Sequence, residues 1–393
     1  MKITNLKTTV VHLDFRNCIL VEIETDAGIT GVSETVMKRK TLTVDQSILQ
    51  LRSYLIGKDP TDIEDHWEKL YRDSFWVGGP MHSTAISAVD CALWDILGKS
   101  LGVPVHKLLG GPTRRRVPAY CHCPAGSSPE EFARNVRHSV ASGYRSFKTT
   151  LPVFYGAKGN GNTNYSGTNG AIDRCWKETE YLNCGVFERI KEFFHAAREA
   201  AGPDIGIAVD CHGRLGLKAA VRLARAVEEV NLMFIEEPVP PENADVLAEV
   251  HRESSTPIAA GERWATIHGV REFVERNAVD ILQCDLVNCG GITGLKKIAA
   301  LAEAHYIGMA PHNPNGPVAT MMNLQFAASI PNYYQLEMIG SQADWQLFSE
   351  MVPTHPHLDA DGCLPVPSAP GFGIELNQEA MANHPYVPHN GWR

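Results

Sequence analysis

The first part of the chain changes from alternating to helical spacing of its apolar residues. Apolar and polar positions alternate, as in strands, over three stretches: residues 3–11, 18–25 and 29–34. Apolar residues then recur three and four positions apart, as in amphipathic helices, over residues 43–55, 63–75 and 83–101. These two periods predict an α+β domain over residues 1–113. Two of its loops, residues 37–40 and 75–80, are expected to lean over a neighbouring active site.

A second pattern begins at Arg116, where short apolar runs alternate with amphipathic stretches. Eight apolar runs end near the following residues: Cys121, Thr150, Asp210, Glu236, Glu262, Asp285, His312 and Glu337. Helical stretches such as residues 217–230 and 294–305 separate them, which predicts parallel strands joined by helices. We therefore predict an α/β fold, a modified (β/α)8 barrel of the TIM type over residues 114–360, with the α+β domain as an N-terminal cap. In such barrels the active site lies at the C-terminal ends of the strands.

One interval between the predicted strands is too long for a single helix and its loops. Residues 151–185 are rich in Gly and Asn before the next helix begins. A long polar insertion at the active-site end of a barrel is typical of a lid, so we predict an inserted loop that covers the site.

Three acidic residues follow consecutive apolar runs at equal spacing. Asp210, Glu236 and Glu262 are each 26 residues apart, about the length of one strand, one helix and their loops. A carboxylate at a strand end often caps the next helix, so each one alone has a structural explanation. All three at the same ends of neighbouring strands would repel one another unless a hard cation lay among them. The spacing therefore predicts a Mg²⁺ site.

Two histidines are the candidates for proton transfer at this site. His212 lies two residues after Asp210, so on a continuous strand both side chains would face the same cavity. His312 follows the seventh run and Asp285 the sixth, so a carboxylate on the neighbouring strand could fix the tautomer of the imidazole and raise its basicity. A lone histidine after a proline is more often structural, and only the strand position favours catalysis. In a ring of eight strands, His212 and His312 are predicted on opposite walls.

Composition narrows the class of protein. A formal charge of −9 argues against a nucleic-acid partner. The start of the chain lacks the apolar core of a secretory leader and no run of 18 apolar residues occurs, so we expect a cytoplasmic protein without a membrane partner. Ten scattered cysteines agree with a reducing compartment. Cys121-His122-Cys123 looks like half of a zinc site, but no second half follows it.

Several motifs together resemble the enolase superfamily, in its mandelate racemase subgroup. They are Lys148-Thr149-Thr150, Asp210-Cys211-His212, I-E-E-P from Ile235, A-G-E-R from Ala260, C-D-L-V-N-C-G-G-I-T from Cys284 and P-H-N-P-N-G-P from Pro311. A-V-D-C-A-L-W-D-I-L-G-K from Ala88 and L-L-G-G from Leu108 resemble the capping domain of that family. The tail, residues 361–393, resembles its closing segment, which returns to the cap. Within the subgroup, the chain is most similar to acid sugar dehydratases of the galactonate dehydratase type.

The resemblance implies a role for each candidate residue and a substrate class. Asp210, Glu236 and Glu262 match the ligands of one Mg²⁺ per subunit. The catalytic candidates are His312 and Asp285 as the base dyad, His212 as the general acid, and Lys148 and Tyr155. The candidates for substrate binding are Glu337, which would bind the substrate carboxylate, Arg263 and His122. The implied enzyme is a carbon–oxygen lyase that acts on a small acid sugar, and a homo-oligomer is expected.

Two departures from the family pattern leave alternatives open. Racemases of the subgroup carry K-x-K on the second strand, whereas Thr150 holds the second position here, which makes an epimerase or a cycloisomerase less favoured. V-F-Y-G-A-K from Val153 resembles mannonate dehydratases, in which a loop tyrosine takes part in the chemistry and Tyr155 is its match. Those enzymes pair this tyrosine with an arginine at about the place of Lys148. Mannonate and gluconate therefore stay as rival substrates, and a metal-containing binding protein without turnover as a further alternative.

Overall fold

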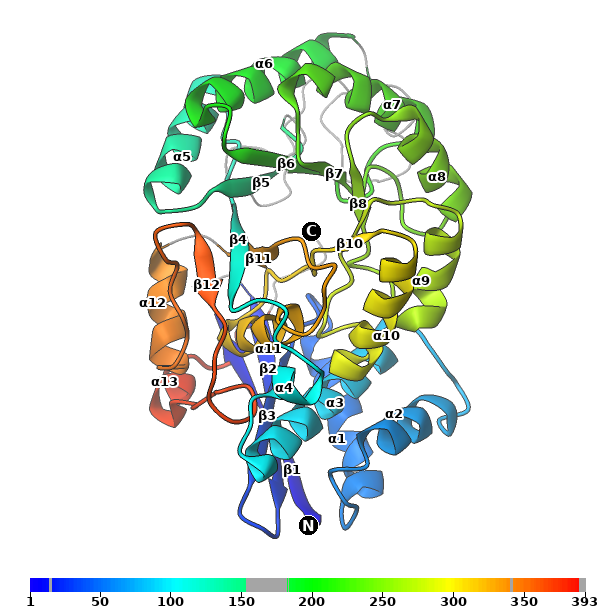
Figure 1. Cartoon of the computed structure of the whole chain (residues 1–393), viewed down its shortest axis with the longest axis vertical. Coiled ribbons are helices and arrows are strands. Elements are labelled where there is room, and N and C mark those ends of the chain that lie inside the picture. The colour runs from blue at the N-terminus through cyan, green and yellow to red at the C-terminus, as the bar shows by residue number, and fades with distance from the viewer. Residues whose placement is uncertain (14–15, 153–181, 183, 340–341, 389–393) are drawn as a thin grey trace.

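A ring of parallel strands forms one part of the molecule and a three-stranded antiparallel sheet lies in the other, as Figure 1 shows for this computed structural model. The structure describes residues 1–13, 16–152, 182, 184–339 and 342–388. Among the described residues, no helix is both long enough and apolar enough to cross a membrane.

The capping domain packs three strands against helices. Its strands, in the order β1-β2-β3, are β1 (Ile3–His12), β2 (Asn17–Thr25) and β3 (Thr30–Thr35). Its helices are α1 (Thr41–Leu55), α2 (Ile63–Arg72), α3 (Pro80–Leu101) and the short α4 (Val105–Leu108). Apolar residues of the sheet, such as Ile19 and Val21, share one core with Val89 of α3. The strand and helix pattern of this domain is therefore confirmed.

The ends of α2 and α3 differ from the predicted bounds for local reasons. α2 stops at Arg72, three residues early, because Phe75 has a positive φ of 63° that a helix does not allow. α3 begins at Pro80, since the missing proline N–H costs nothing in the first turn. It ends before Gly102, whose left-handed φ of 68° stops the helix.

The second part is a closed barrel of eight parallel strands. These are β4 (Arg116–His122), β5 (Ser146–Thr150), β6 (Gly206–Asp210), β7 (Phe234–Glu236), β8 (Ile258–Ala260), β9 (Ile281–Leu282), β10 (Gly308–Met309) and β11 (Leu336–Met338). β11 pairs with β4, and Met309 on β10 bridges to Tyr333 just before β11. The N–H of Met309 donates to Asn332 at 2.7 Å and Tyr334 donates to Met309 at 2.7 Å, which closes the ring. The predicted barrel is confirmed.

Helices surround the ring and one apolar layer fills it. The helices are α5 (Pro129–Ala141), α6 (Cys184–Ala201), α7 (Leu217–Ala226), α8 (Ala244–Glu253), α9 (Thr266–Glu275), α10 (Gly291–Ala304), α11 (Pro317–Ala327) and α12 (Gln342–Met351), with a short 3-10 turn η1 (Glu228–Val230) after α7. Figure 1 shows α6 to α9 as an outer arc around the strands. Tyr120, Phe234 and Ile281 belong to a small separate cluster contributed by β4, β7 and β9. This layer is the floor beneath the polar residues at the strand ends.

Buried polar groups join the cap to the barrel near β9. On α3, Ser87 Oγ accepts the N–H groups of Gly290 at 2.8 Å and Gly291 at 2.9 Å, and Asp90 accepts that of Thr293 at 3.0 Å. These donors belong to the N-terminus of α10, where backbone N–H groups lack partners within the helix. The cap therefore satisfies the start of a barrel helix that follows a site strand.

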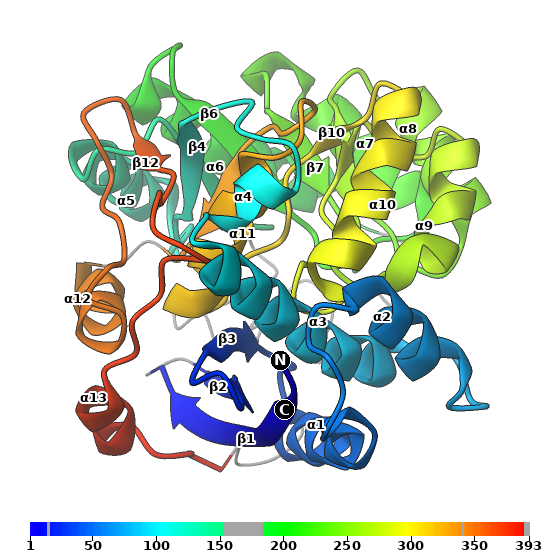
Figure 2. The same ribbon diagram turned by 60° about the horizontal axis from the view of Figure 1, so that its bottom comes forward.

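The C-terminal segment runs from the barrel back to the cap. β12 (Cys363–Pro365) pairs antiparallel with β4, and α13 (Gln378–Asn383) follows. The N–H of His12 then donates to His384 at 2.8 Å, and Asn17 Nδ2 donates to Val387 at 2.8 Å. Figure 2 shows this segment passing beside α12 to reach β1. The domain boundaries drawn from the sequence stay a prediction.

Candidate active site

Asp210, Glu236 and Glu262, the acidic triad, come together at one end of the barrel. Each offers a carboxylate oxygen, and these oxygens all lie within 4.8 Å of one another. Asp210 and Glu236 are the last residues of β6 and β7, which are neighbours in the ring. Glu262 stands two residues beyond β8, after Gly261, whose φ of +144° suits only glycine. The ends of three neighbouring strands therefore bring three carboxylate oxygens close together.

The donor set of the triad fits a hard divalent cation. Burial, together with the charges of Asp210, Glu337 and Glu262, raises the pKa of Glu236 to about 8 against the opposing effect of Lys148. A cation among these oxygens would relieve the repulsion that opposes ionisation. Carboxylate oxygens are the ligands that Mg²⁺ and similar cations prefer. The triad is thus a candidate site for a divalent metal.

Lys148 lies beneath the triad and is held by carboxylates. Its ammonium donates to both oxygens of Glu236, at 3.0 and 2.8 Å, and lies 2.7 Å from Oε1 of Glu337. Only 2% of its surface is exposed. Burial would lower the pKa of Lys148, but Glu236 and Glu337 outweigh it and raise the pKa well above its usual value. Lys148 is therefore a fixed positive charge here.

Glu337 is buried with both oxygens engaged. His122 Nε2 makes a short contact with Oε1, the oxygen that Lys148 also approaches, and the N–H of Asn313 donates to Oε2 at 2.9 Å. Burial would raise the pKa of Glu337, yet the charges of Lys148 and His312 hold it well below its usual range. His122 is the more exposed partner, with 41% of its side chain accessible. The structure thus groups three predicted residues, Lys148, Glu337 and His122, in one network.

His312 and Asp285 form the predicted pair. His312 Nδ1 lies 2.8 Å from Asp285 Oδ2, and Nε2 lies 3.0 Å from Oε2 of Glu262. Burial would lower the pKa of His312, but the charges of Glu262 and Glu337 and the hydrogen bond with Asp285 raise it to about 10. Asn315 Nδ2 also donates to Asp285, at 3.2 Å to Oδ2. The carboxylate is therefore fixed from two sides.

His212 reaches the triad by a different route from the one expected. β6 ends at Asp210 and His212 has a positive φ of 50°, so it lies in a tight turn and the strand alternation does not apply to it. Its N–H donates to Asp210 Oδ1 at 2.8 Å, and its Nε2 lies 3.0 Å from Oδ2 of Asp210. Burial would lower the pKa of His212, but the charge of Asp210 outweighs it and raises the pKa. The turn, with the imidazole folded back on the carboxylate, places the ring beside the triad.

Arg263, a candidate for substrate binding, lies beside the triad. Arg263 Nε donates to Glu237 Oε2 at 2.9 Å and lies 3.5 Å from Glu262 Oε1, so its guanidinium supports the second acid of the I-E-E-P motif and one triad member. Tyr155 and most of the predicted lid lie outside the described residues.

Comparison with models of protein families identifies the family of this chain. Residues 2–110 match the mandelate racemase / muconate lactonizing enzyme N-terminal domain, and residues 131–380 match the enolase C-terminal domain-like family. The chain belongs to the enolase superfamily. The resemblance seen in the motifs is confirmed.

Relatives within the superfamily cover nearly the whole chain. A D-galactonate dehydratase of Pectobacterium atrosepticum is 35% identical over 384 residues, which are 97% of this chain and 94% of that protein. A D-mannonate dehydratase of Caulobacter vibrioides is 33% identical over 396 residues, 98% of this chain and 95% of that protein. A mandelate racemase/muconate lactonizing enzyme-like protein of Rubrobacter xylanophilus has a structure with a TM-score of 0.87 at 32% identity, covering 98% of each chain. These relatives confirm the prediction of a dehydratase, a carbon–oxygen lyase.

Sequence reasoning about this superfamily member missed several residues of the site. Gln283 Nε2 donates to Glu236 Oε2 at 2.8 Å, and it could have been found as the alternate residue before Asp285 on the same run. Asn313 and Asn315 stand in the P-H-N-P-N-G-P motif, in which the sequence predicts a role only for His312. In the cap, burial lowers the pKa of Arg16, and the charges of Glu337, Asp285 and Glu262 act against this effect. Burial likewise lowers the pKa of Lys38, in the 37–40 loop, and the charge of Glu262 acts to raise it. The cap thus brings cations towards the site.

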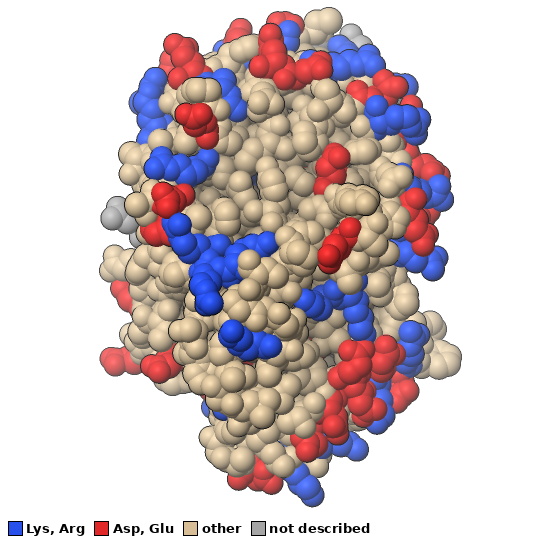
Figure 3. Space-filling model, viewed as in Figure 1, with Lys and Arg blue, Asp and Glu red and all other residues tan. Residues whose placement is uncertain are grey.

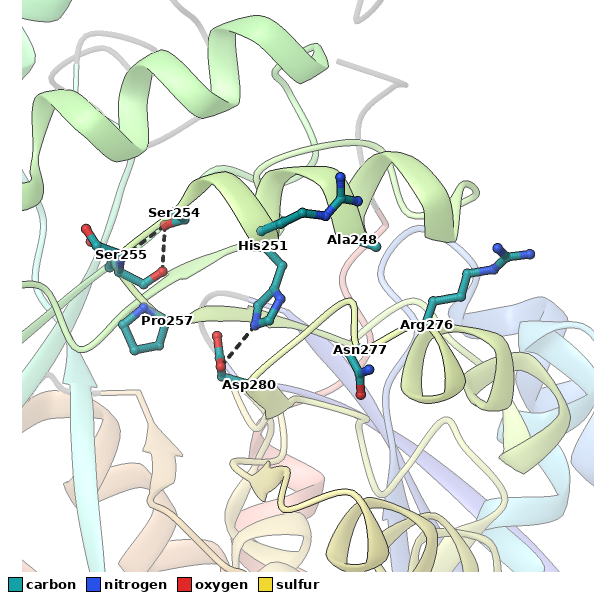
Figure 4. Close-up of a pocket in the computed structure, with 10 residues that line it drawn as sticks. Ala248, His251, Ser254, Ser255, Pro257, Arg276, Asn277 and Asp280 are labelled. Carbon is teal, nitrogen blue, oxygen red and sulfur yellow. Dashed lines mark hydrogen bonds and ion pairs between the residues drawn. The ribbon is translucent and has the colours of Figure 1, made fainter.

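A pocket of about 450 Å³ at the other end of the strands is separate from this site. Its lining residues precede β8 and β9, whereas the triad follows its strands. His251 and Asp280 meet there at 3.1 Å, as Figure 4 shows, and Asp280 also accepts the N–H of Ile258 at 2.8 Å. Arg276 is paired with Asp245 at 2.5 Å. His251 and Arg276 of this pocket therefore already have acidic partners.

Proposed function

We propose that the chain is a Mg²⁺-dependent aldonate dehydratase that converts a galactonate-like sugar acid into a 2-keto-3-deoxy acid. One observation carries this proposal: two imidazoles, His212 and His312, flank one carboxylate triad and contact different members of it. A site that only bound a metal would need neither. Removal of water from an acid needs both, because a proton and a hydroxyl must leave.

The proton next to a carboxylate is a very weak acid, because its removal adds a second negative charge to a charged group. Bound by the triad, Mg²⁺ would supply the positive charge that stabilises the developing enediolate. Lys148 contributes a further fixed charge, since the neighbouring carboxylates of Glu236 and Glu337 outweigh its burial and keep it protonated. A Lys or His base beside Mg²⁺ is the general pattern of enolase-type sites.

His312 is the proposed base. Its Nδ1 faces Asp285, so its Nε2 is the nitrogen that faces the triad. The carboxylate of Asp285 favours a proton on Nδ1. A cation held by the triad would offset the charge of Glu262, one cause of the raised pKa of His312, and so free the lone pair of Nε2 for the substrate. Asn315 holds Asp285 and thereby the ring. The α-proton of the substrate would pass to Nε2.

His212 is the proposed acid. The charge of Asp210 raises its pKa, which favours the protonated imidazolium that a hydroxyl leaving group requires. It follows β6, and β6 and β10 lie four strands apart in the ring of eight. Proton and hydroxyl would therefore leave from opposite faces, in an anti elimination.

The segment after β10 favours galactonate among the acid sugars. P-H-N-P-N-G-P matches the galactonate type, and one relative carries that activity in its name. Mannonate stays the second candidate because another relative is named for it. Epimerisation is less favoured, since Thr150 cannot act as a base and Lys148 is enclosed by Glu236 and Glu337.

The test is a screen of D-galactonate, D-mannonate and D-gluconate for 2-keto acid formation with Mg²⁺. We expect turnover on at least one of them, with galactonate first, and none after replacement of Glu236 by Gln. Formation of an epimer without keto acid would replace the proposal with a racemase-type activity. Metal binding without any product from this set would contradict it.

A further inference from the structure

We infer that Glu34 of the capping domain is a positioning residue for the His312 segment across the domain boundary. This inference rests on the proposed function for its kinetic part only. Glu34 lies on β3 and is fully buried. It is outside every motif that the catalytic proposal uses.

Glu34 binds the start of α11, the helix that follows β10. Its Oε1 accepts the N–H of Gly316 at 2.6 Å, and its Oε2 accepts those of Val318 at 3.1 Å and Ala319 at 3.2 Å. Residue 317 is a proline and has no N–H. Glu34 therefore satisfies every backbone donor from 316 to 319, a set that a helix N-terminus leaves without partners.

The close approach depends on Gly316. A Cβ added to Gly316 would lie 2.6 Å from Oε1 and 2.7 Å from Oε2 of Glu34, and 2.7 Å from Leu13. Glycine at this position lets the carboxylate reach the backbone. Cap and barrel thus fit at this point without space for a side chain.

The segment that Glu34 holds carries the base and its supports. Between His312 and Gly316 lie Asn313, whose N–H donates to Glu337, and Asn315, which donates to Asp285. A small displacement of α11 would move His312 and both of these contacts together. Misplacement of a catalytic group by about 1 Å can cost on the order of 100-fold in rate.

β3 is itself anchored on both sides of Glu34. Ser33 Oγ donates to the carbonyl of Ala88 on α3 at 2.6 Å. Thr35 Oγ1 donates to that of Val287 at 3.0 Å, two residues after Asp285. Burial raises the pKa of Glu34 to about 7, so this carboxyl is costly to ionise where it stands. The anchoring makes β3 a rigid support for the His312 segment.

The test compares Glu34→Gln with Asp95→Asn as a matched control. Asp95 is equally buried and also accepts backbone N–H groups, from Val32 at 2.9 Å and Phe372 at 2.8 Å, but it binds β3 and the tail instead of α11. In E34Q the side-chain NH₂ group would face a backbone N–H at the start of α11, and two donors cannot form a hydrogen bond. Amide hydrogen exchange over residues 312–320 should therefore speed up in E34Q and stay at the wild-type rate in D95N. This readout does not depend on activity.

Kinetics supply the second readout. We expect kcat of E34Q to fall about 10- to 100-fold with KM changed by no more than about twofold. Mg²⁺ affinity should be retained, because the triad lies on β6 to β8. Glu34→Asp keeps the charge at shorter reach and should recover part of both readouts. If E34Q does not fold, Glu34→Asp is compared with D95N in its place.

Wild-type exchange over residues 312–320 in E34Q would overturn the inference, as would equal losses of kcat in E34Q and D95N. An inactive wild-type enzyme on every acid sugar would instead overturn the proposed function. The exchange data would then still judge the role of Glu34.

Discussion

At the scale of single residues, replacing His312 and replacing His212 should have different effects on the reaction. His312→Asn should abolish both dehydration and exchange of the α-proton with solvent deuterium, because the base is gone. His212→Asn should lose dehydration by about 100-fold or more while exchange persists, since His312 and Asp285 remain in place. NMR of recovered substrate in D₂O measures exchange, and keto acid formation measures dehydration. Exchange at the wild-type rate in H312N would move the role of base to another residue.

Residues whose type and position both carry chemistry could be predicted, and residues that act through contacts could not. The equal spacing of Asp210, Glu236 and Glu262 predicted their grouping, and their carboxylate oxygens lie within 4.8 Å of one another. Gln283 and Asn315 are ordinary polar residues in sequence, and only their distances to Glu236 and Asp285 show what they support. Hydrogen-bond partners across strands are a property of register that local sequence does not contain.

At the scale of elements, Asp90 on α3 should make the stability of the protein depend on pH. Burial raises its pKa from an ordinary 3.8 to about 7, so between these values the folded protein binds more protons than the unfolded chain. The stability from this group is complete below pH 3.8 and is lost as pH rises through about 7. Asn at this position does not titrate. The unfolding free energy of wild type minus that of Asp90→Asn should therefore fall by about 2–3 kcal/mol from pH 5 to 7.5.

Urea unfolding of both proteins across that range measures this difference. Asp204→Asn, at an exposed position, is the control and should change the slope less. A difference that rises with pH would show that Asp90 is ionised more readily in the fold than in the unfolded chain.

The bounds of long elements were predictable from the sequence, and those of short elements were ambiguous. α3, with 22 residues, was found to within three residues. β9 and β10 have two residues each, so the predicted runs overestimated the strands and placed Asp285 and His312 on them. Both residues lie beyond the ladder, where the backbone turns. His212 shows the same effect, because its positive φ depends on the turn after β6.

At the scale of the whole molecule, metal binding should stabilise the fold. A ligand that binds only the folded state adds about 2.7 kcal/mol at 100 times its Kd. Thermal unfolding after chelation and again with Mg²⁺ should show a higher midpoint with the metal, and Glu236→Gln should lose most of this gain. Glu68→Gln is the control, because this acid pairs with Arg72 on the exposed face of α2. Equal gains in both variants would place the stabilising ion elsewhere.

On the face drawn in Figure 3, basic side chains gather left of the centre and acidic ones at the lower right, whereas both signs are mixed along the barrel helices. The alternation of strands and helices made the barrel predictable. The contact of Glu34 with the barrel was not, because Glu34 and its partner Gly316 lie 282 positions apart in the chain.

The return of the C-terminal segment to the cap sets the order in which the protein can be completed during its synthesis. β1 leaves the ribosome long before the barrel does, and the partners of His12 and Asn17 are residues 384 and 387, more than 350 positions later. At roughly 5–20 residues per second, the cap waits tens of seconds for them. During that time the outer edge of β1 is open to pairing with a strand of another chain. The nascent protein therefore carries this edge of β1 without its partners until residues 384–387 have been made.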